Sequence, residues 1–479
     1  MRRIRTICSS AVLFVLTALV SVAQDVKYIE YDTDLIAPSV YKARREKLMQ
    51  DIGSDAAAVF YSAPVRSRNW DVEYLYRQDD NFYYLTGFTE PNSILVLAPK
   101  GVSVRSMDDS TKMVTVEELL FVQSRDPQSE TWEGRRYGPA GAMKLRGIEY
   151  AVTNDKFESM LGAVFSFQSR PRLLYVPTMR ADLTGEIAEL VQPLKRTMER
   201  MSVADALRDP TPMVRKMRTI KSPEEIAMLR KATEISAMAH NEAMMSVEPG
   251  MKEYELDAVY QYVFRKNGSE FYGYPCIVGA AENSVILHYN SNRKPIKNGD
   301  VVLADCAAEY HGYSSDVTRT YPANGTFSKA QREIYQIVLD AQNAAIATVK
   351  PGSQWSDASA AAENVIMDGL YKLGIIKNKT RQEMRKFYMH GLGHPVGLNT
   401  HDVGQPTMEV GMLYTVEPGI YISEESGAPA QYLNIGVRIE DVILVTPQGT
   451  EILSVGSPRE INAIESLMKK KGVGNQSMR

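Results

Sequence analysis

Residues 301–319 read VVLADCAAEYHGYSSDVTR and place two aspartates inside apolar, strand-forming sequence. The pattern predicts two strands, over 300–308 and 314–319, joined by a tight turn. The midpoint between Asp305 and Asp316 falls in that turn, so in a simple hairpin their side chains lie opposite each other on one face of the sheet. Opposed carboxylates repel each other, and their burial is unfavourable unless a divalent cation or a shared proton compensates the charge.

The same pattern recurs further along the chain. Predicted strands over 412–422 and 432–446 contain Glu417 and Glu440. The midpoint between these glutamates falls in the loop Ser426–Pro429, so the two side chains can also lie in register on neighbouring strands. Four converging acids offer an oxygen-rich site that can hold two cations.

Histidines supply a second type of ligand. Three of the 6 histidines lie close together among glycines, which let the backbone approach a ligand closely: His390, His394 and His401. A neutral imidazole adds a nitrogen donor, which favours manganese, cobalt, zinc or iron over calcium. His288 ends another predicted strand, over 284–289. A single acid or histidine is more often structural, whereas two matching acid hairpins with a histidine cluster indicate a metal site.

The other histidines and the cysteines of the mature chain are interpreted as structural. His240 falls within a predicted helix, and His311 falls in a predicted exposed turn. Cys276 and Cys306 are too few for a disulfide framework, and a domain of this size does not need one. We therefore expect two buried free thiols.

The length of 479 residues predicts two domains. Mixed strands and helices over 35–210 indicate an α/β domain. A capping box at Ser222–Glu225 then begins a new helix, so the boundary is placed just before it. The second domain, 215–465, repeats a pattern of helices followed by strands, which suggests two related halves around one sheet. A polar tail is expected over 466–479.

The first residues predict a targeting segment. Basic residues precede an apolar run, Ala11–Val20, that is too short to span a bilayer, and Ser21–Ala23 offers a cleavage site. We expect a cleaved signal peptide over 1–23 and a mature protein that is secreted or periplasmic and free of the membrane, with an uncleaved anchor as the alternative. The net charge of -3 argues against a nucleic-acid partner.

Taken together, these motifs resemble the pita-bread metallopeptidases, which include aminopeptidase P, prolidase and methionine aminopeptidase. The second domain matches that family in order and spacing at Ile286–Tyr289, Asp305, Asp316–Thr320, His390–His401, Thr415–Gly419 and Arg438–Asp441. Upstream, Tyr76–Phe88 and Trp132–Gly138 are similar to the aminopeptidase P N-terminal domain, which methionine aminopeptidases lack. The resemblance covers nearly all of the mature chain. It implies an α/β (α+β) fold: a mixed N-terminal domain, then a catalytic domain with a curved, mainly antiparallel sheet covered by helices.

The resemblance also implies a role for each matching residue. Two divalent cations, manganese first with cobalt or zinc as alternatives, would be held by Asp305, Asp316, His394, Glu417 and Glu440. In that scheme Asp305 binds one ion in a bidentate manner, and Asp316 and Glu440 bridge both. Glu417 would take a proton from the attacking water, and His288 and His401 would support the reacting groups. The proline ring of the substrate would be surrounded by His390, Tyr421 and Arg438.

These roles imply an Xaa-Pro aminopeptidase, which hydrolyses the bond between an N-terminal residue and a following proline through a hydroxide bridging two metals. Its substrates would be peptides with proline in second place, and homo-oligomers are common among such enzymes. An Xaa-Pro dipeptidase like prolidase is the nearest alternative. A non-catalytic peptide-binding module and a small-molecule C–N hydrolase like creatinase are more remote, because such proteins lack the full ligand set.

Overall fold

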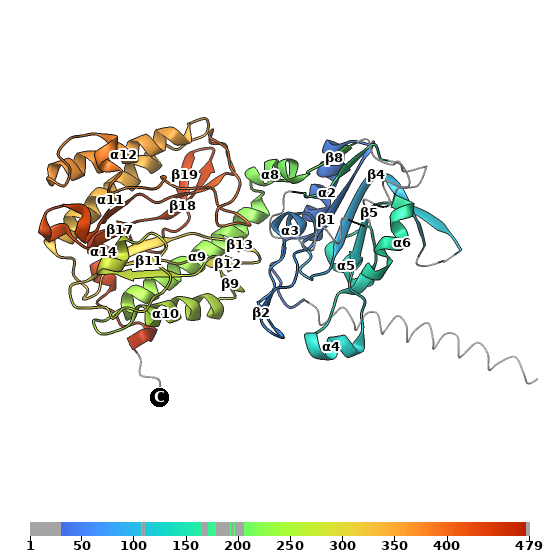
Figure 1. Cartoon of the computed structure of the whole chain (residues 1–479), viewed down its shortest axis with the longest axis horizontal. Helices are drawn as coiled ribbons and strands as arrows, with labels where there is room; N and C mark the ends of the chain where they lie inside the picture. The colour runs from blue at the N-terminus through green and yellow to red at the C-terminus, as the bar shows by residue number, and fades with distance from the viewer. Residues whose placement is uncertain are drawn as a thin grey trace, which may run out of the picture. The chain divides into compact units, whose positions relative to one another are not determined.

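A computed structural model of the chain describes residues 30–106, 109, 111–164, 171–178, 192, 196 and 206–475. The chain divides into two compact units between Arg215 and Lys216 (Figure 1). The predicted signal peptide, 1–23, lies outside the described residues. Within the described ranges, no helix is both long enough and apolar enough to cross a bilayer.

The first unit is built on a six-stranded mixed sheet with the strand order β6-β5-β4-β1-β7-β8. Its three central strands are antiparallel, and β6, β7 and β8 join by parallel pairing. The strands are β1 (Ala56–Tyr61), β4 (Ile94–Arg105), β5 (Met113–Val122), β6 (Tyr150–Thr153), β7 (Leu173–Tyr175) and β8 (Ala206–Arg208). Every residue of β1 is buried, which explains why its sequence is continuously apolar rather than alternating.

Short helices and one exposed hairpin complete the first unit. They are α2 (Pro38–Ile52), α3 (Asp80–Thr86), α4 (Pro127–Glu133), α5 (Gly138–Arg146), α6 (Phe157–Val164), β2 (Ser67–Asn69) and β3 (Val72–Glu73). The sheet buries one contiguous apolar cluster that includes Val59, Val96 and Phe121. The apolar runs at 56–61, 93–97 and 172–176 form β1, the start of β4, and β7.

One carboxyl group of the first unit is buried with one oxygen left without a hydrogen-bond partner. Glu90 Oε1 accepts a hydrogen bond of 2.7 Å from the backbone N–H of Tyr137, whereas Oε2 is buried and has none among the described residues. Burial raises the pKa of Glu90 to about 7, even though Arg136 and Arg125 lower it. The folded state therefore retains a proton that the unfolded chain releases near the ordinary glutamate pKa of 4.5, so the stability contributed by Glu90 falls as the pH rises through both pKa values.

We expect Glu90→Gln to stabilise the protein increasingly as the pH rises. Glutamine retains the Oε1 acceptor and cannot ionise, so the gain in unfolding free energy should be below ~1 kcal/mol near pH 5 and ~1–3 kcal/mol near pH 8. Thermal unfolding at the two pH values measures it. Glu158→Gln, at an exposed position of α6, is the control. An equal shift for Glu90→Gln at both pH values would contradict the burial of an ionising carboxyl group.

The second unit consists of short antiparallel sheets between helices. The strand orders are β10-β11-β14, β13-β12-β9, β15-β18-β19 and β16-β17. The strands are β9 (Phe271–Tyr272), β10 (Ile277–Ala280), β11 (Val301–Asp305), β12 (Ala308–Tyr310), β13 (Tyr313–Ser314), β14 (Thr318–Pro322), β15 (Leu413–Val416), β16 (Gly419–Ile422), β17 (Ile435–Arg438), β18 (Asp441–Thr446) and β19 (Gly449–Ile452). Every strand pair recorded in this unit is antiparallel, as predicted.

Two helix pairs cover these sheets. One pair is α9 (Pro223–Ser246) with α10 (Glu253–Lys266), and it contacts β10, β12 and β13. The other is α11 (Lys329–Thr348) with α12 (Trp355–Lys372), and α11 contacts β15, β16 and β17. In Figure 1 the two pairs lie on opposite sides of the strands of this unit. The predicted capping box at Ser222 is confirmed, because Glu225 N donates to its hydroxyl and Glu225 Oε2 accepts from its backbone N–H.

The register of the first acid hairpin differs from the prediction by two residues. Asp305 lies opposite Thr318 rather than opposite Asp316. The turn consists of His311 and Gly312, both with positive φ (48° and 81°), which is typical of a two-residue hairpin turn. A shift of two residues keeps the side chains on the same face of the pair, so the two aspartates still converge.

The register of the second acid hairpin is as predicted, but its strands are broken at the acids. Val416 lies opposite Asp441 and Gly419 lies opposite Arg438, so the same register places Glu417 opposite Glu440. The predicted strand over 412–422 is interrupted between β15 and β16, and the one over 432–446 between β17 and β18. Both glutamates lie in these interruptions.

Three smaller predictions are wrong. No strand covers 284–289, because a 3-10 helix occupies Ala281–Val285 and the residues after it pair with no strand. His311 is buried rather than exposed, and its Nδ1 lies 2.7 Å from the carboxylate of Glu270. The tail predicted over 466–479 is attached to α9 as far as residue 475, since the Asn475 amide donates to the carbonyl of Ser246. Residues 476–479 lie outside the described part. The free, buried state of both cysteines is confirmed.

Candidate metal centre

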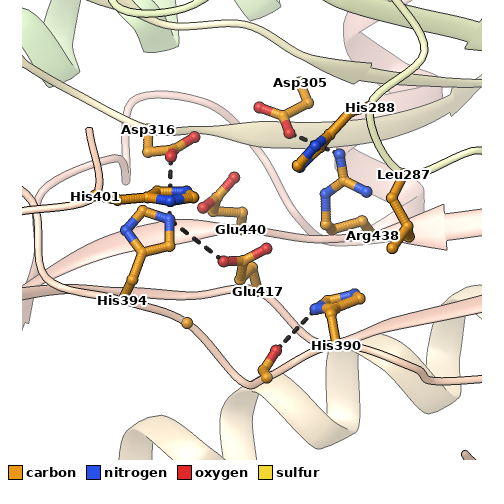
Figure 2. Close-up of a pocket in the computed structure, with 12 residues that line it drawn as sticks. Leu287, His288, Asp305, Asp316, His390, His394, His401, Glu417, Arg438 and Glu440 are labelled. Atoms are coloured by element: carbon orange, nitrogen blue, oxygen red, sulfur yellow. Dashed lines mark hydrogen bonds and ion pairs between the residues drawn. The ribbon is translucent and has the colours of Figure 1, made fainter. Parts of the chain in front are cut away.

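The interrupted strands of the second unit surround a cavity of about 280 Å³. Asp305 ends β11 and Asp316 precedes β14, while Glu417 and Glu440 come from the breaks between β15 and β16 and between β17 and β18. Figure 2 shows these four carboxylates pointing toward one another. The cavity is lined by Leu287, His288, Asp305, Asp316, His390, Gly391, Gly393, His394, His401, Glu417, Arg438 and Glu440.

Three of these side chains form a compact group of donor atoms. One ligand atom each from Asp316, His394 and Glu440 lies within 4.8 Å of the other two. His394 Nε2 is 3.3 Å from Asp316 Oδ2 and 3.5 Å from Glu417 Oε1. The backbone N–H of His394 donates to Thr415 Oγ1 at 2.9 Å, which fixes the histidine loop against β15. Carboxylate oxygens with one imidazole nitrogen are a donor set suited to manganese, cobalt or zinc.

Asp305 lies at the edge of this group and is held by an arginine. Arg438 Nη2 donates to Asp305 Oδ2 at 2.6 Å, and Arg438 Nη1 donates to the hydroxyl of Tyr421 at 3.0 Å. That hydroxyl also lies 2.8 Å from His390 Nε2. A continuous hydrogen-bonded chain therefore runs from a carboxylate of the site to His390 at the cavity wall.

The four carboxylates of the site carry more negative charge than the arginine beside them can neutralise. Burial, reinforced by Glu440, raises the pKa of Glu417 to about 8. Burial, and then the charges of Asp305 and Glu417, also raise the pKa of Asp316 well above its usual range. The pKa of Glu440 is also raised, by burial and then by the charges of Asp316 and Asp305. Without metal these shifts favour the protonated form of the carboxyl groups, and divalent cations would replace those protons. The residues present therefore fit a metal centre.

Three histidines stand around the carboxylates. His401 lies against His394 with the ring centroids 4.0 Å apart and the ring planes tilted by 53°. The pKa of His401 is lowered by burial and then by His394. His390 is also neutral near pH 7, because burial and then Arg438 lower its pKa to about 4. In Figure 2, His288 lies beside Asp305 and Arg438, while His401 lies beside Asp316 and His394. The imidazoles thus flank the acids on different sides.

Comparison with known proteins places this geometry in a family. Residues 227–447 match metallopeptidase family M24, and residues 41–175 match the aminopeptidase P N-terminal domain. The Xaa-Pro aminopeptidase of Escherichia coli is 37% identical over 90% of this chain and 98% of its own. Human Xaa-Pro aminopeptidase 3 is 34% identical over 89% of this chain and 85% of its own. The chain belongs to metallopeptidase family M24.

Solved structures agree with this assignment. Aminopeptidase P from E. coli with the inhibitor Pro-Leu is 37% identical, covers 91% of this chain and 98% of its own, and has a TM-score of 0.82. Proline aminopeptidase P II from Yersinia pestis has the same TM-score at 36% identity, with 91% and 100% covered. The predicted fold class, a mixed N-terminal domain before a pita-bread domain, is confirmed. So are the predicted recognition as an aminopeptidase P and the main functional prediction of a metallo-aminopeptidase of the Xaa-Pro type.

In this metallopeptidase, the structure brings the predicted site residues together in one place. All five predicted ligands, the candidate catalytic histidines His288 and His401, and His390 and Arg438 line the cavity. Tyr421 does not line it, but its hydroxyl contacts both His390 and Arg438. Their individual roles remain predictions.

Sequence reasoning missed Tyr274, which bridges two of the carboxylates. Its hydroxyl lies within hydrogen-bond distance of Asp305 Oδ1 and, at 2.5 Å, of Asp316 Oδ1. One hydroxyl carries one proton, so both contacts cannot be donated at once. A proton on one carboxyl group or a cation between them resolves the conflict. No motif in the sequence indicates this tyrosine, which follows a strand of only two residues, β9.

A buried ion cluster behind His401 was also missed. The carboxylate of Asp402 accepts from Arg218 Nη2 at 2.5 Å, and Lys221 Nζ lies 3.3 Å from its other oxygen. All three side chains are almost completely buried. Burial lowers the pKa of Lys221, and the charge of Asp402 opposes that shift. The cluster fixes the loop that presents His401, using residues nearly two hundred positions earlier in the chain.

Proposed function

We propose that the protein removes the N-terminal residue from peptides whose second residue is proline, using two divalent cations. The single observation that carries this proposal is the convergence of three buried carboxylates, the half-buried carboxylate of Glu417 and His394 on one cavity. The names of the similar proteins support the proline specificity. Manganese is our first candidate for the metal, with cobalt or zinc as alternatives.

The ions would be held by Asp305, Asp316, His394, Glu417 and Glu440. When bound, they would supply Lewis-acid polarisation of the scissile carbonyl and activate a water molecule near neutral pH. The protein contributes a preformed set of donors, whose mutual repulsion the cations would relieve in place of the protons held without metal. Burial of the donors strengthens each of these electrostatic interactions.

Glu417 is our candidate for proton transfer. A carboxylate within reach of the attacking water can accept a proton from it and later return that proton, which is the role of a general base that then acts as an acid. It reaches the cavity from the break between β15 and β16 and lies 3.5 Å from His394 Nε2. His288 and His401 border the same space and would stabilise charge on the carbonyl oxygen or pass a proton toward the prolyl nitrogen.

Recognition of proline must rely on shape, because the prolyl nitrogen carries no hydrogen in the peptide. His390 and Arg438 line one side of the cavity, and the hydroxyl of Tyr421 joins them from behind, so the three form one hydrogen-bonded wall. Each is fixed by its neighbours, so the wall is rigid and can select a ring of one size. We assign the proline subsite to this wall.

A substrate panel tests the proposed function. After chelation with EDTA, we expect cleavage of Xaa-Pro-Yaa tripeptides to be lost and then restored by Mn²⁺, with release of the first residue alone. Peptides with alanine in second place should react far more slowly. Preference for the dipeptide Xaa-Pro over longer peptides would favour the prolidase alternative, and undiminished cleavage by metal-free protein would end the two-metal proposal.

We also propose that the mature protein is exported. The sequence of the first 23 residues supports this, with basic residues before a short apolar run and small residues at the expected cut. N-terminal sequencing of the protein from its native cells should begin near Gln24. A sequence beginning at the first residues would contradict cleavage.

A further inference from the structure

The strand ladder is interrupted beside two of the metal ligands. β11 ends at Asp305 and β14 begins at Thr318, so the residues just inside the hairpin belong to neither strand. Cys306, Ala308 and Val317 are nevertheless completely buried. Buried backbone N–H and C=O groups require partners, and at these positions the strands do not supply all of them.

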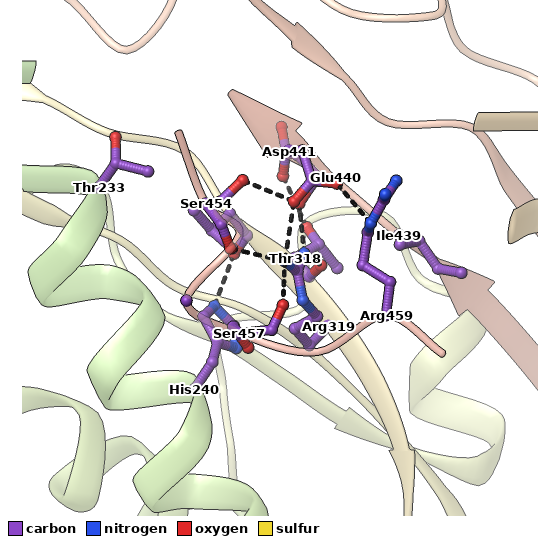
Figure 3. A network of polar contacts seen from close by, with 12 residues as sticks. Thr233, His240, Thr318, Arg319, Ile439, Glu440, Asp441, Ser454, Ser457 and Arg459 are labelled. Carbon is purple, nitrogen blue, oxygen red and sulfur yellow. Dashed lines mark hydrogen bonds and ion pairs between the residues drawn. The ribbon is translucent and has the colours of Figure 1, made fainter. Parts of the chain in front are cut away.

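One face of α9 supplies further partners, in addition to the Cys306 N–H that donates to the carbonyl of Val317 at 3.2 Å. Thr233, Ser236 and His240 are spaced by three and four residues and so share a side of the helix. His240 Nε2 lies 2.8 Å from the carbonyl oxygen of Val317 and 3.1 Å from that of Cys306. We call these three residues the α9 polar face. Figure 3 shows Thr233 and His240 on this helix.

The other two members contact the same hairpin. Ser236 Oγ accepts from the backbone N–H of Ala308 at 3.0 Å. Thr233 Oγ1 accepts from the hydroxyl of Ser315 at 2.9 Å. The α9 polar face therefore holds the hairpin at points on both of its arms, from Cys306 to Val317.

The donor state of His240 follows from its partners. Carbonyl oxygens only accept, so Nε2 carries the proton, and Nδ1 accepts from the hydroxyl of Tyr260 at 2.9 Å. Burial lowers the pKa of His240 to about 3, so the ring stays neutral at working pH. Its single N–H spans two carbonyls, each one residue after an expected metal ligand.

We propose that the α9 polar face is a positioning element that fixes the spacing of Asp305 and Asp316 and thereby sets the metal affinity. The two carboxylates repel each other, so a hairpin free to relax would carry them apart. A backbone hydrogen bond from Cys306 N to Val317 O joins the two arms, and the His240 N–H ties both arms to α9 directly behind the aspartates. Ser236 anchors the first arm to the same helix. This inference rests on the proposed metal site.

Calorimetric titration of chelator-stripped protein with Mn²⁺, together with the visible spectrum of the Co²⁺ form, tests the proposal. Ser236→Ala and His240→Leu remove partners of the hairpin, whereas His240→Gln retains a donor near the Nε2 position. We expect the first two to weaken Mn²⁺ binding about 10- to 100-fold and to alter the Co²⁺ spectrum. His240→Gln should recover most of the affinity.

Ser246→Ala is the matched control. Ser246 is a completely buried hydroxyl residue on the same helix, and its Oγ accepts from Gly474 N at 3.0 Å, away from the hairpin. It should lower the unfolding temperature while retaining wild-type Mn²⁺ affinity.

The proposal would be overturned if Ser236→Ala, His240→Gln and His240→Leu all bound Mn²⁺ with wild-type affinity. Affinity losses in Ser246→Ala that match those in Ser236→Ala would do the same, since the effect would then follow stability alone. If His240→Leu does not fold, the Mn²⁺ affinity of Ser236→Ala decides whether the proposal stands. Failure of the wild type to bind Mn²⁺ would instead reject the proposed function, and this inference with it.

Discussion

Glu417→Gln should lower kcat for an Xaa-Pro tripeptide by about 10²- to 10⁴-fold, the usual contribution of a positioned acid–base group. Glutamine has nearly the same shape and cannot accept a proton. It also removes one of the nearby negative charges that raise the pKa of Asp316. The fold should survive, because Glu417 lies in a break between strands and its removal relieves repulsion with Glu440.

Steady-state kinetics with metal-loaded protein, with metal content measured on the same sample, check this prediction. Glu425→Gln is a suitable control, because it lies on the same segment of chain and is exposed. A Glu417→Gln protein that contains two metal ions and turns over at a near-normal rate would reject the proton-transfer role. Loss of activity together with loss of metal would assign Glu417 to binding alone.

Asp316→Asn should abolish metal binding and activity while making the metal-free protein more stable. The folded pKa of Asp316 lies well above its unfolded value, because burial and the nearby charges of Asp305 and Glu417 disfavour ionisation. The stability contributed by such a group is complete below the unfolded pKa and is lost as the pH rises toward the folded pKa. The metal-free wild type should therefore lose stability as the pH rises above the usual pKa of an aspartate, by about 1.4 kcal/mol for each unit of pKa difference.

Thermal unfolding in the presence of a chelator measures this effect. For Asp316→Asn we expect a flatter dependence of unfolding temperature on pH and a gain of ~1–3 kcal/mol near pH 8 relative to the wild type. Adding Mn²⁺ should stabilise the wild type and leave the variant unchanged. A variant that is less stable than the wild type at every pH in chelator would contradict the account of a repulsive, metal-requiring site.

The register of the acid hairpins could be predicted from sequence to different degrees. For Glu417 and Glu440 the midpoint of the loop gave the observed pairing, because the hairpin is nearly symmetric about residues 428 and 429. For Asp305 the midpoint was displaced, because His311 and Gly312 adopt positive φ in a tighter turn. The error does not change the predicted site, since a shift of two residues leaves the two aspartate side chains on the same face.

Other features could not be predicted, because they depend on contacts distant in sequence. The strand breaks at Glu417 and Glu440 arise where chains pass from one short sheet to the next, and no turn residue other than Pro418 marks them. Tyr274 reaches Asp316 across 42 positions. Arg218 meets Asp402 across 184 positions. Local periodicity carries no information about such pairs, whereas the acids were visible because charge is unexpected in apolar strands.

Calorimetric titration of the chelator-stripped enzyme with Mn²⁺, in two buffers of different ionisation enthalpy, tests the central claim most directly. Cations that replace protons on Asp316, Glu417 and Glu440 must release those protons. The account predicts two ions bound per chain and a net proton release near neutral pH that falls as the pH is raised. Binding of metal without proton release, or no binding at all, would contradict it.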